Sequence, residues 1–142
     1  MIVKYNLSAI CKLANRIVKG GIKRSEAFKR AWMAAKQGLI EKVAGVTFGN
    51  RQLALQQLDR CSKKDIEVRL YREPDNPADS LAVAVVVAVK GQNHYRIGYL
   101  PHRSAAVIAS LMDQDVQFMT VLQGIVGGLY GHSYGMRIRI QV

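Results

Sequence analysis

The first forty residues carry apolar positions at the spacing of two amphipathic helices. Apolar residues recur three or four positions apart over residues 7–18, and Gly20-Gly21 supplies a stop where a left-handed cap forms without steric cost. A second helix is predicted over residues 25–37, with basic side chains opposite its apolar side and a glycine after its end. Residues 1–40 are therefore predicted to form a helical hairpin.

From residue 41 the apolar positions change to the two-residue period of strands. Strands are predicted at residues 43–48, 66–71, 81–89, 95–99, 116–126 and 136–142, and short helices at residues 50–58 and 104–112. Five or six short strands with two small helices are typical of an α+β fold, here a small OB-like β-barrel. We expect a boundary between a basic helical hairpin, residues 1–40, and a barrel domain, residues 41–142.

Four features bear on packing, location and redox state. Trp32 is interpreted as the core anchor of the hairpin, with stacking on a nucleobase as the alternative. The longest apolar run has nine residues, whereas a membrane-spanning helix needs about 20, so no membrane segment is predicted. A secretory signal has an unbroken apolar stretch, but lysines and arginines interrupt the N-terminus of this sequence. We therefore expect a cytoplasmic protein. The alternative is a mitochondrial transit peptide, because such peptides share this basic character. Cys11 and Cys61 lack C-x-x-C spacing and are expected to be reduced.

The net charge of +11 is concentrated in the predicted hairpin. Residues 1–40 contain nine lysines and arginines against the single acid Glu26, while the remaining residues are much closer to balance. Such a basic excess favours polyanionic partners, chiefly nucleic acid, through the release of counterions. Solvated charge that keeps the protein soluble is the alternative interpretation.

Sequence patterns for catalysis, metal binding or cofactor binding are missing. The histidines His94, His102 and His132 are scattered, and neither cysteine stands at metal-ligand spacing from them. There is no phosphate-binding G-x-x-x-x-G-K-[ST] sequence and no G-x-S-x-G nucleophile sequence. We therefore expect neither an enzyme nor a bound cofactor.

Aromatic and basic residues alternate in the predicted barrel domain at strand ends and loops. The aromatic members are Phe48, Tyr71, Tyr99, Tyr130 and Tyr134, and the basic members are Arg72, His102 and Arg103. Single-stranded nucleic acid is commonly held by such mixtures, because bases stack on rings while cations meet phosphates. Packing in the core explains any one of these tyrosines at least as well.

Three segments resemble the HIRAN domain family: "VAGVTFGNR", "VRLYREPDNPADSLAVAV" and "YRIGYLPHRSAAVIASLMD". The central block is the most specific, and the likeness extends over residues 41–142. HIRAN domains occur in large fork-remodelling ATPases and as stand-alone bacterial or phage proteins, and this short chain is similar to the second kind. The resemblance implies an OB-like barrel that binds single-stranded DNA and captures its free 3′ end.

The resemblance also implies roles for particular residues. Asp79 stands where an acidic residue accepts a hydrogen bond from the terminal 3′-hydroxyl, Phe48 where a tyrosine stacks on a base, and His102 where a lysine meets phosphate. Tyr134 stands near a late aromatic position, and Tyr99 where histidine is also used. Two positions depart from the end-binding members, with Thr47 in place of an arginine and Ala78 in place of a stacking tyrosine. Losing a cation and a ring, each worth about 1–3 kcal/mol, predicts weaker capture of the end.

The sequence thus favours a nucleic-acid-binding module that takes single-stranded DNA and, in its most specific form, a free 3′ end. The candidate contacts are Phe48, Arg72, Asp79, Tyr99, His102, Arg103 and Tyr134. Asp79 has a second interpretation, since a carboxylate after two prolines can cap a turn by accepting backbone N–H groups. The alternative function is a protein-interaction or assembly module that uses the apolar side of residues 7–39.

Overall fold

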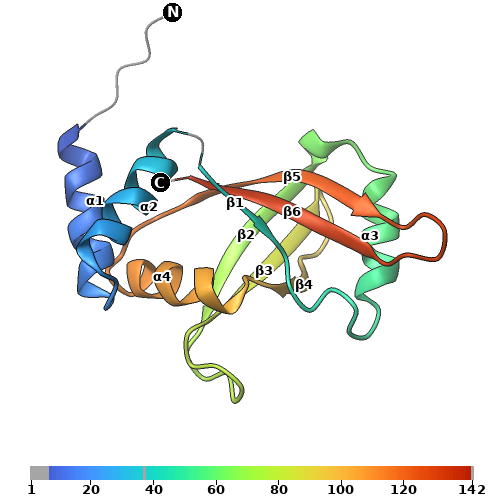
Figure 1. Ribbon diagram of the computed structural model, residues 1–142. Helices are drawn as coiled ribbons and strands as arrows, with labels where there is room; N and C mark the ends of the chain where they lie inside the picture. The colour runs from blue at the N-terminus through green and yellow to red at the C-terminus, as the bar shows by residue number, and fades with distance from the viewer. Residues whose placement is uncertain (1–6, 37, 142) are drawn as a thin grey trace, which may run out of the picture.

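The computed structural model describes residues 7–36 and 38–141, and within them not the side chains of residues 7 and 32–36. The elements follow one another along the chain as in Figure 1. They are α1 (Leu7–Lys19), α2 (Arg24–Lys36), β1 (Leu39–Lys42), α3 (Arg51–Asp59), the short 3-10 helix η1 (Lys63–Asp65), β2 (Ile66–Glu73), β3 (Ala82–Val89), β4 (Tyr95–Tyr99), α4 (His102–Asp113), β5 (Met119–Gly127) and β6 (Tyr134–Gln141). The N-terminal helices and the α+β class are as predicted.

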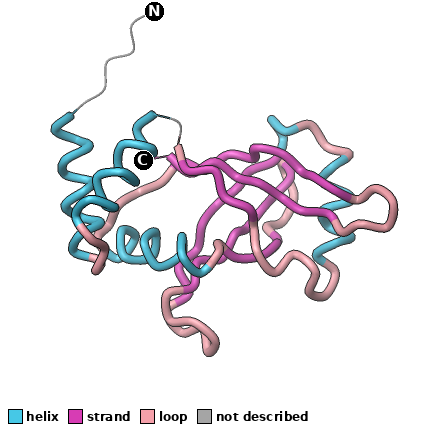
Figure 2. Tube along the Cα trace, in the orientation of Figure 1, coloured by secondary structure: helices cyan, strands magenta, loops and turns pink. Residues whose placement is uncertain are grey.

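The strands form two antiparallel sheets, ordered β1-β6-β5 and β2-β3-β4. Figure 2 shows the two sheets crossing one another, with helices gathered at both ends. Among the described strands no backbone ladder joins β2 to β5, so the predicted barrel is not closed. A side chain links these edges instead, because the Thr120 hydroxyl donates to the Val68 carbonyl over 2.5 Å.

The main core fills the space between the two sheets. Its fully buried members include Val83 and Val85 of β3, Ile97 of β4, and Ile138 and Ile140 of β6. β3 is buried along nearly its whole length, as its continuous apolar run predicted. α3 and α4 close the core with further side chains, Leu55, Leu58, Ala105, Ile108 and Ala109.

A second core joins the helical hairpin to α4. The apolar side of α1, including Ile10 and Ile17, packs with Ala27 and Ala31 of α2 against side chains on the far side of α4. Those side chains are Val107 and Leu111, and Val116 follows them just beyond the helix. The hairpin therefore shares α4 with the sheets. The predicted anchor Trp32 has its side chain outside the described residues.

The predicted strand at residues 43–48 is wrong. A four-residue strand, β1, lies just before it and pairs with β6, while the segment itself makes an isolated bridge and then turns toward α3. Gly45 and Gly49 adopt positive φ values of 72° and 55°, a conformation that strands do not use. Phe48 consequently lies in a loop that precedes α3, not in a strand. No helix in the described parts of the chain has both the length and the apolar character needed to cross a bilayer.

Candidate nucleic-acid interface

The turn between β2 and β3 is organised by two side chains of the Pro-rich block. The Asn76 side-chain oxygen accepts hydrogen bonds from the backbone N–H groups of Ala78 (2.9 Å) and Asp79 (3.1 Å). Asp79 in turn accepts from the Leu81 N–H through Oδ1 at 2.9 Å. Asx-type bonds of this kind replace a backbone ladder where the chain reverses. The turn-capping interpretation of Asp79 therefore holds for one of its two oxygens.

The second carboxylate oxygen of Asp79 faces the start of α4. Oδ2 lies 2.9 Å from Nδ1 of His102, whose side chain is 81% exposed. The Leu81 N–H, and next the His102 ring, lower the pKa of Asp79 below its ordinary value of 3.8. An ionised acceptor is thus held at the surface beside an exposed ring. Such an oxygen can accept a hydrogen bond from an incoming hydroxyl.

An arginine stacked between two rings forms the aromatic part of the site. The Arg51 guanidinium carbon lies 5.8 Å from the ring centroids of both Phe48 and Tyr99, within cation–π range. Its Nη1 donates to the Gly45 carbonyl at 2.7 Å, which fixes the guanidinium between them. Phe48 is 69% exposed, so its ring offers a stacking surface to solvent.

A close backbone approach brings the loop that carries Phe48 to β4. Ala44 and Tyr99 exchange two backbone hydrogen bonds, of 2.7 and 2.9 Å. Gly98 permits this approach, because a Cβ at that position would overlap the Ala44 carbonyl oxygen and lie 2.7 Å from Val43 Cγ1. Any larger residue at this position of "YRIGYLP" would therefore push the loop away from β4.

Hydrogen bonds connect the rings to the turn. The Tyr99 hydroxyl donates to Glu73 Oε1 at 3.1 Å, and the Asn76 amide donates to the same oxygen, also at 3.1 Å. Arg96 Nη2 lies 3.0 Å from Glu73 Oε2 as an ion pair, without the geometry of a hydrogen bond. An open hollow of about 570 Å³ lies between the turn and β4, large enough for a nucleotide-sized ligand.

Three predicted contacts do not join the ring and turn network directly. Arg72 pairs with Asp113 at 3.1 and 3.3 Å and donates to the Ser80 carbonyl at 2.7 Å, with its side chain only 16% exposed. It still borders the hollow, and its charge helps to lower the pKa of Asp79. Arg103 is exposed on the first turn of α4 and makes no ion pair with any described residue. Tyr134 is half-buried at the start of β6, where it packs against the main core.

Tyr134 is nevertheless tied to the same helix as Arg51. Its backbone N–H donates to the side-chain oxygen of Gln52 at 2.7 Å, and the Gln52 amide donates to the Tyr134 carbonyl at 3.0 Å. The same amide also donates to the Val46 carbonyl at 3.0 Å. Gln52 thus holds the start of β6 against the loop that carries Phe48.

The sequence prediction missed Arg51, Glu73 and Arg96. All three stand inside the family-like segments, within three residues of a predicted contact, which is the signal that could have identified them. Thr47 and Ala78, the two departures from the end-binding pattern, are both exposed. Within the described ranges, no group of three or more histidine, cysteine or carboxylate side chains is arranged to hold a metal ion.

A comparison with protein-family models places most of this sequence in one family. The model of the HIRAN domain family matches residues 45–141. The crystal structure of a protein from Lactobacillus plantarum is similar at 22% identity and a TM-score of 0.52, covering 75% of this chain and 96% of that one. The HIRAN domain of human HLTF is similar at 22% identity and a TM-score of 0.44, over 73% and 74% of the two chains. No protein with a curated description matches significantly.

Proposed function

The chain belongs to the HIRAN domain family, and on that basis we propose that it holds single-stranded DNA at the interface described above and receives a free 3′ end there. HIRAN domains are DNA-binding modules, and no catalytic step is part of the proposal. One observation carries it: ring contacts and hydrogen bonds run without a break from Phe48 through Arg51 and Tyr99 to the turn that presents Asp79.

Each part of this run has a task. The exposed Phe48 ring stacks on a base near the end of the strand, since base stacking on aromatic rings tolerates any sequence. The terminal 3′-hydroxyl donates to Asp79 Oδ2 and displaces His102 from that oxygen. Because His102 is exposed, its ring is then free to turn toward phosphate, where Arg103 on the same helix turn adds charge.

The two parts of the chain contribute differently in this proposal. Residues 41–142 form the DNA-binding domain, and the basic hairpin of residues 1–40 adds phosphate contacts from exposed side chains such as Lys12, Arg16 and Lys19. The alternative of an assembly module is less favoured by the packing, because the apolar side of α1 is already buried against α4. Phe28 of α2 stays 42% exposed and serves below as a control position.

Fluorescence anisotropy with a labelled oligonucleotide tests the proposal, using strands that end in a 3′-hydroxyl or a 3′-phosphate. Phe48→Ala should weaken binding of both strands about 5- to 150-fold, the equivalent of about 1–3 kcal/mol of stacking. Asp79→Asn should weaken only the strand with the free hydroxyl. Phe28→Ala, which removes a similar exposed ring from α2, should change neither.

Two results would contradict different levels of the proposal. If wild-type protein binds no oligonucleotide even at low salt, where phosphate contacts are strongest, nucleic-acid binding is refuted. If both strands bind equally tightly to wild type, capture of the 3′ end is refuted while binding of single strands stands.

A further inference from the structure

The outward face of the β2-β3-β4 sheet carries two cross-strand rows in register. Tyr71 of β2 and Tyr99 of β4 both pair with Ala84 of the central strand. The next row places Arg69 of β2 and Arg96 of β4 on either side of Val86. Residues that face one another across a sheet lie on the same side, so an aromatic row is followed directly by a basic row.

The central strand contributes small, buried side chains between these rows. Its outward residues are Ala84, Val86 and Ala88, none more than 9% exposed. Tyr71 on the flanking strand is 48% exposed. The surface of this face is therefore formed by the longer side chains of β2 and β4, whose strands stand about 10 Å apart.

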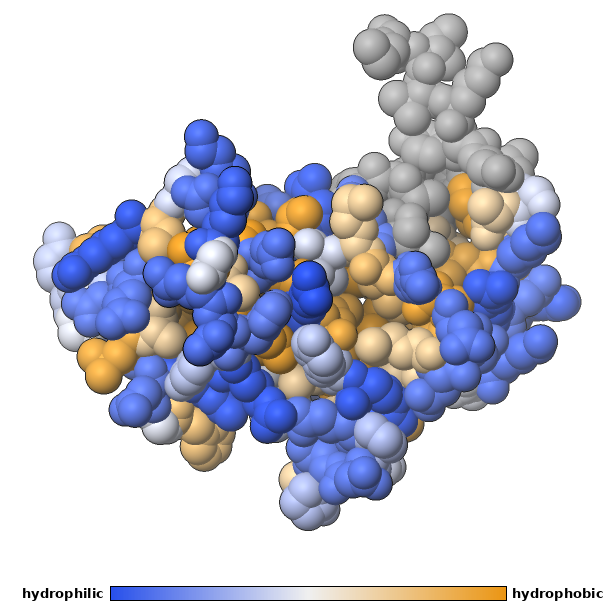
Figure 3. Space-filling view, turned by 180° about the vertical axis from the view of Figure 1, so that it is seen from behind, coloured by the Kyte–Doolittle hydropathy of each residue, from blue (hydrophilic) through white to orange (hydrophobic). Residues whose placement is uncertain are grey.

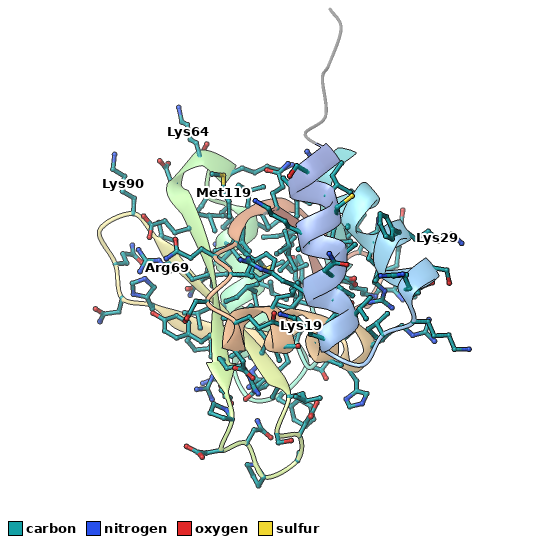
Figure 4. The ribbon with its side chains drawn as sticks, turned by 90° about the vertical axis from the view of Figure 1, so that its left-hand side faces the viewer. Lys19, Lys29, Lys64, Arg69, Lys90 and Met119 are labelled. Atoms are coloured by element: carbon teal, nitrogen blue, oxygen red, sulfur yellow. The ribbon has the colours of Figure 1, made fainter. Side chains whose placement is uncertain are left out.

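Unpaired positive charge extends this face at the end farther from Tyr71 and Tyr99. Lys64 in η1 and Lys90 after β3 form no ion pair with any described residue. In Figure 4, Lys64, Arg69 and Lys90 project to one side, away from α1 and α2. Figure 3, which views the molecule from behind, shows hydrophilic residues over much of this side with apolar residues between them.

Arg96 of the basic row is held by Glu73 at 3.0 Å, but the carboxylate neighbour of Arg69 binds it only weakly. Arg69 lies 3.6 Å from Glu67, and both side chains are more than half exposed. Exposed pairs of this kind contribute about 0–1 kcal/mol, because water screens them. A phosphate can therefore replace Glu67 at Arg69 with little loss.

This face is continuous with the interface already described. Tyr99 belongs to both, since it closes the aromatic row and also stacks on Arg51. From the Ala84 row to Lys90 the central strand rises six residues, about 20 Å at the usual spacing. That length accommodates several nucleotides beyond the captured end, within the usual range of about 4–16 for an OB-type domain.

We propose that the outward face of β2-β3-β4 is the path along which the DNA strand leaves the captured end, with Tyr71 stacking on a base and Arg69 and Lys90 meeting phosphates. The inference rests on the proposed function, because it extends the site of Phe48 and Tyr99. The ligand is a single strand, since the aromatic row requires bases that are not paired.

Anisotropy with two oligothymidines, a trinucleotide and one of about twelve nucleotides, tests the path. Tyr71→Ala should weaken binding of the longer strand about 5- to 150-fold and leave the trinucleotide within about 2-fold of wild type. Tyr71→Phe keeps the ring and should restore binding of the longer strand. Arg69→Gln should lower the slope of log affinity against log salt by about 0.7 for the longer strand alone.

Matched controls come from the same fold. Tyr95 on β4 is 40% exposed but lines the groove beside α3, so Tyr95→Ala should leave both affinities unchanged. Arg137 is an exposed strand arginine of the other sheet, and Arg137→Gln should leave the salt slope unchanged. Thermal unfolding of each variant verifies that it is folded.

The outcomes separate this inference from the function on which it rests. If the longer strand binds no tighter than the trinucleotide, or if Tyr71→Ala binds it as tightly as wild type, the path is refuted and the end site stands. If wild type binds neither probe, the proposed function fails and the path with it.

Discussion

Replacing Gly98 by alanine should both destabilise the fold and damage the interface. Gly98 has an ordinary backbone conformation, so alanine is not strained by its φ value. The added methyl group would instead overlap the Ala44 carbonyl oxygen and crowd Val43. Overpacking of this kind costs about 1–3 kcal/mol. If the loop moves away to relieve it, the two Ala44–Tyr99 hydrogen bonds break, at about 1 kcal/mol each.

By either route the expected loss is about 1–3 kcal/mol in the free energy of unfolding, a sizeable part of the usual 5–15 kcal/mol. Guanidinium denaturation followed by circular dichroism measures it. Gly124→Ala in β5 is the control, since only the tip of Lys63 lies within 4.0 Å of the added Cβ, and its effect should stay within about 0.5 kcal/mol. The reasoning is refuted if Gly98→Ala costs less than about 1 kcal/mol. It is also refuted if folded Gly98→Ala binds DNA like wild type, because the loop that carries Phe48 would then not have moved.

Two further predictions concern charge. Because the Leu81 N–H and the His102 ring lower the pKa of Asp79, its carboxylate should stabilise the fold fully above its ordinary pKa of 3.8 and lose this effect as pH falls through the lower folded-state value. Urea denaturation across pH should show a constant difference between wild type and Asp79→Asn at neutral pH that narrows only in acid, and a difference that grows in acid would contradict the prediction. Replacing the exposed Lys12, Arg16 and Lys19 with glutamine should lower the salt slope of DNA binding by about 0.7 for each phosphate that these side chains neutralise, and an unchanged slope would exclude the hairpin from the interface.

Local patterns were enough to predict the elements with strong periodicity. The two N-terminal helices and the buried strand β3 have long, regular apolar patterns, and the structure places them close to the predicted bounds. The strand predicted at residues 43–48 had only four alternating positions, and two glycines with positive φ turn the chain there instead. β1 escaped prediction because four residues carry little pattern and its partner β6 lies about a hundred residues away.

Part of the candidate site could also be predicted from local sequence, and part could not. The Asn76 and Asp79 turn followed from its own residues, because its hydrogen bonds join neighbours in the sequence. Arg51 could not be found locally, since its position between Phe48 and Tyr99 depends on the approach of Ala44 to β4. The place of Arg72 follows from alternation: once Glu73 faces Tyr99, its neighbour in the strand must face α4.

The double burial of α4 has a practical consequence for anyone who trims this protein. A recombinant fragment cut to the family match, residues 45–141, would omit β1 and the whole hairpin. The cut would uncover Val107 and Leu111 and leave the backbone of β6 without its neighbour along Leu39–Lys42. Exposed strand edges and apolar helix faces promote aggregation. The stretch that relatives share is thus shorter than the stretch that must be expressed together.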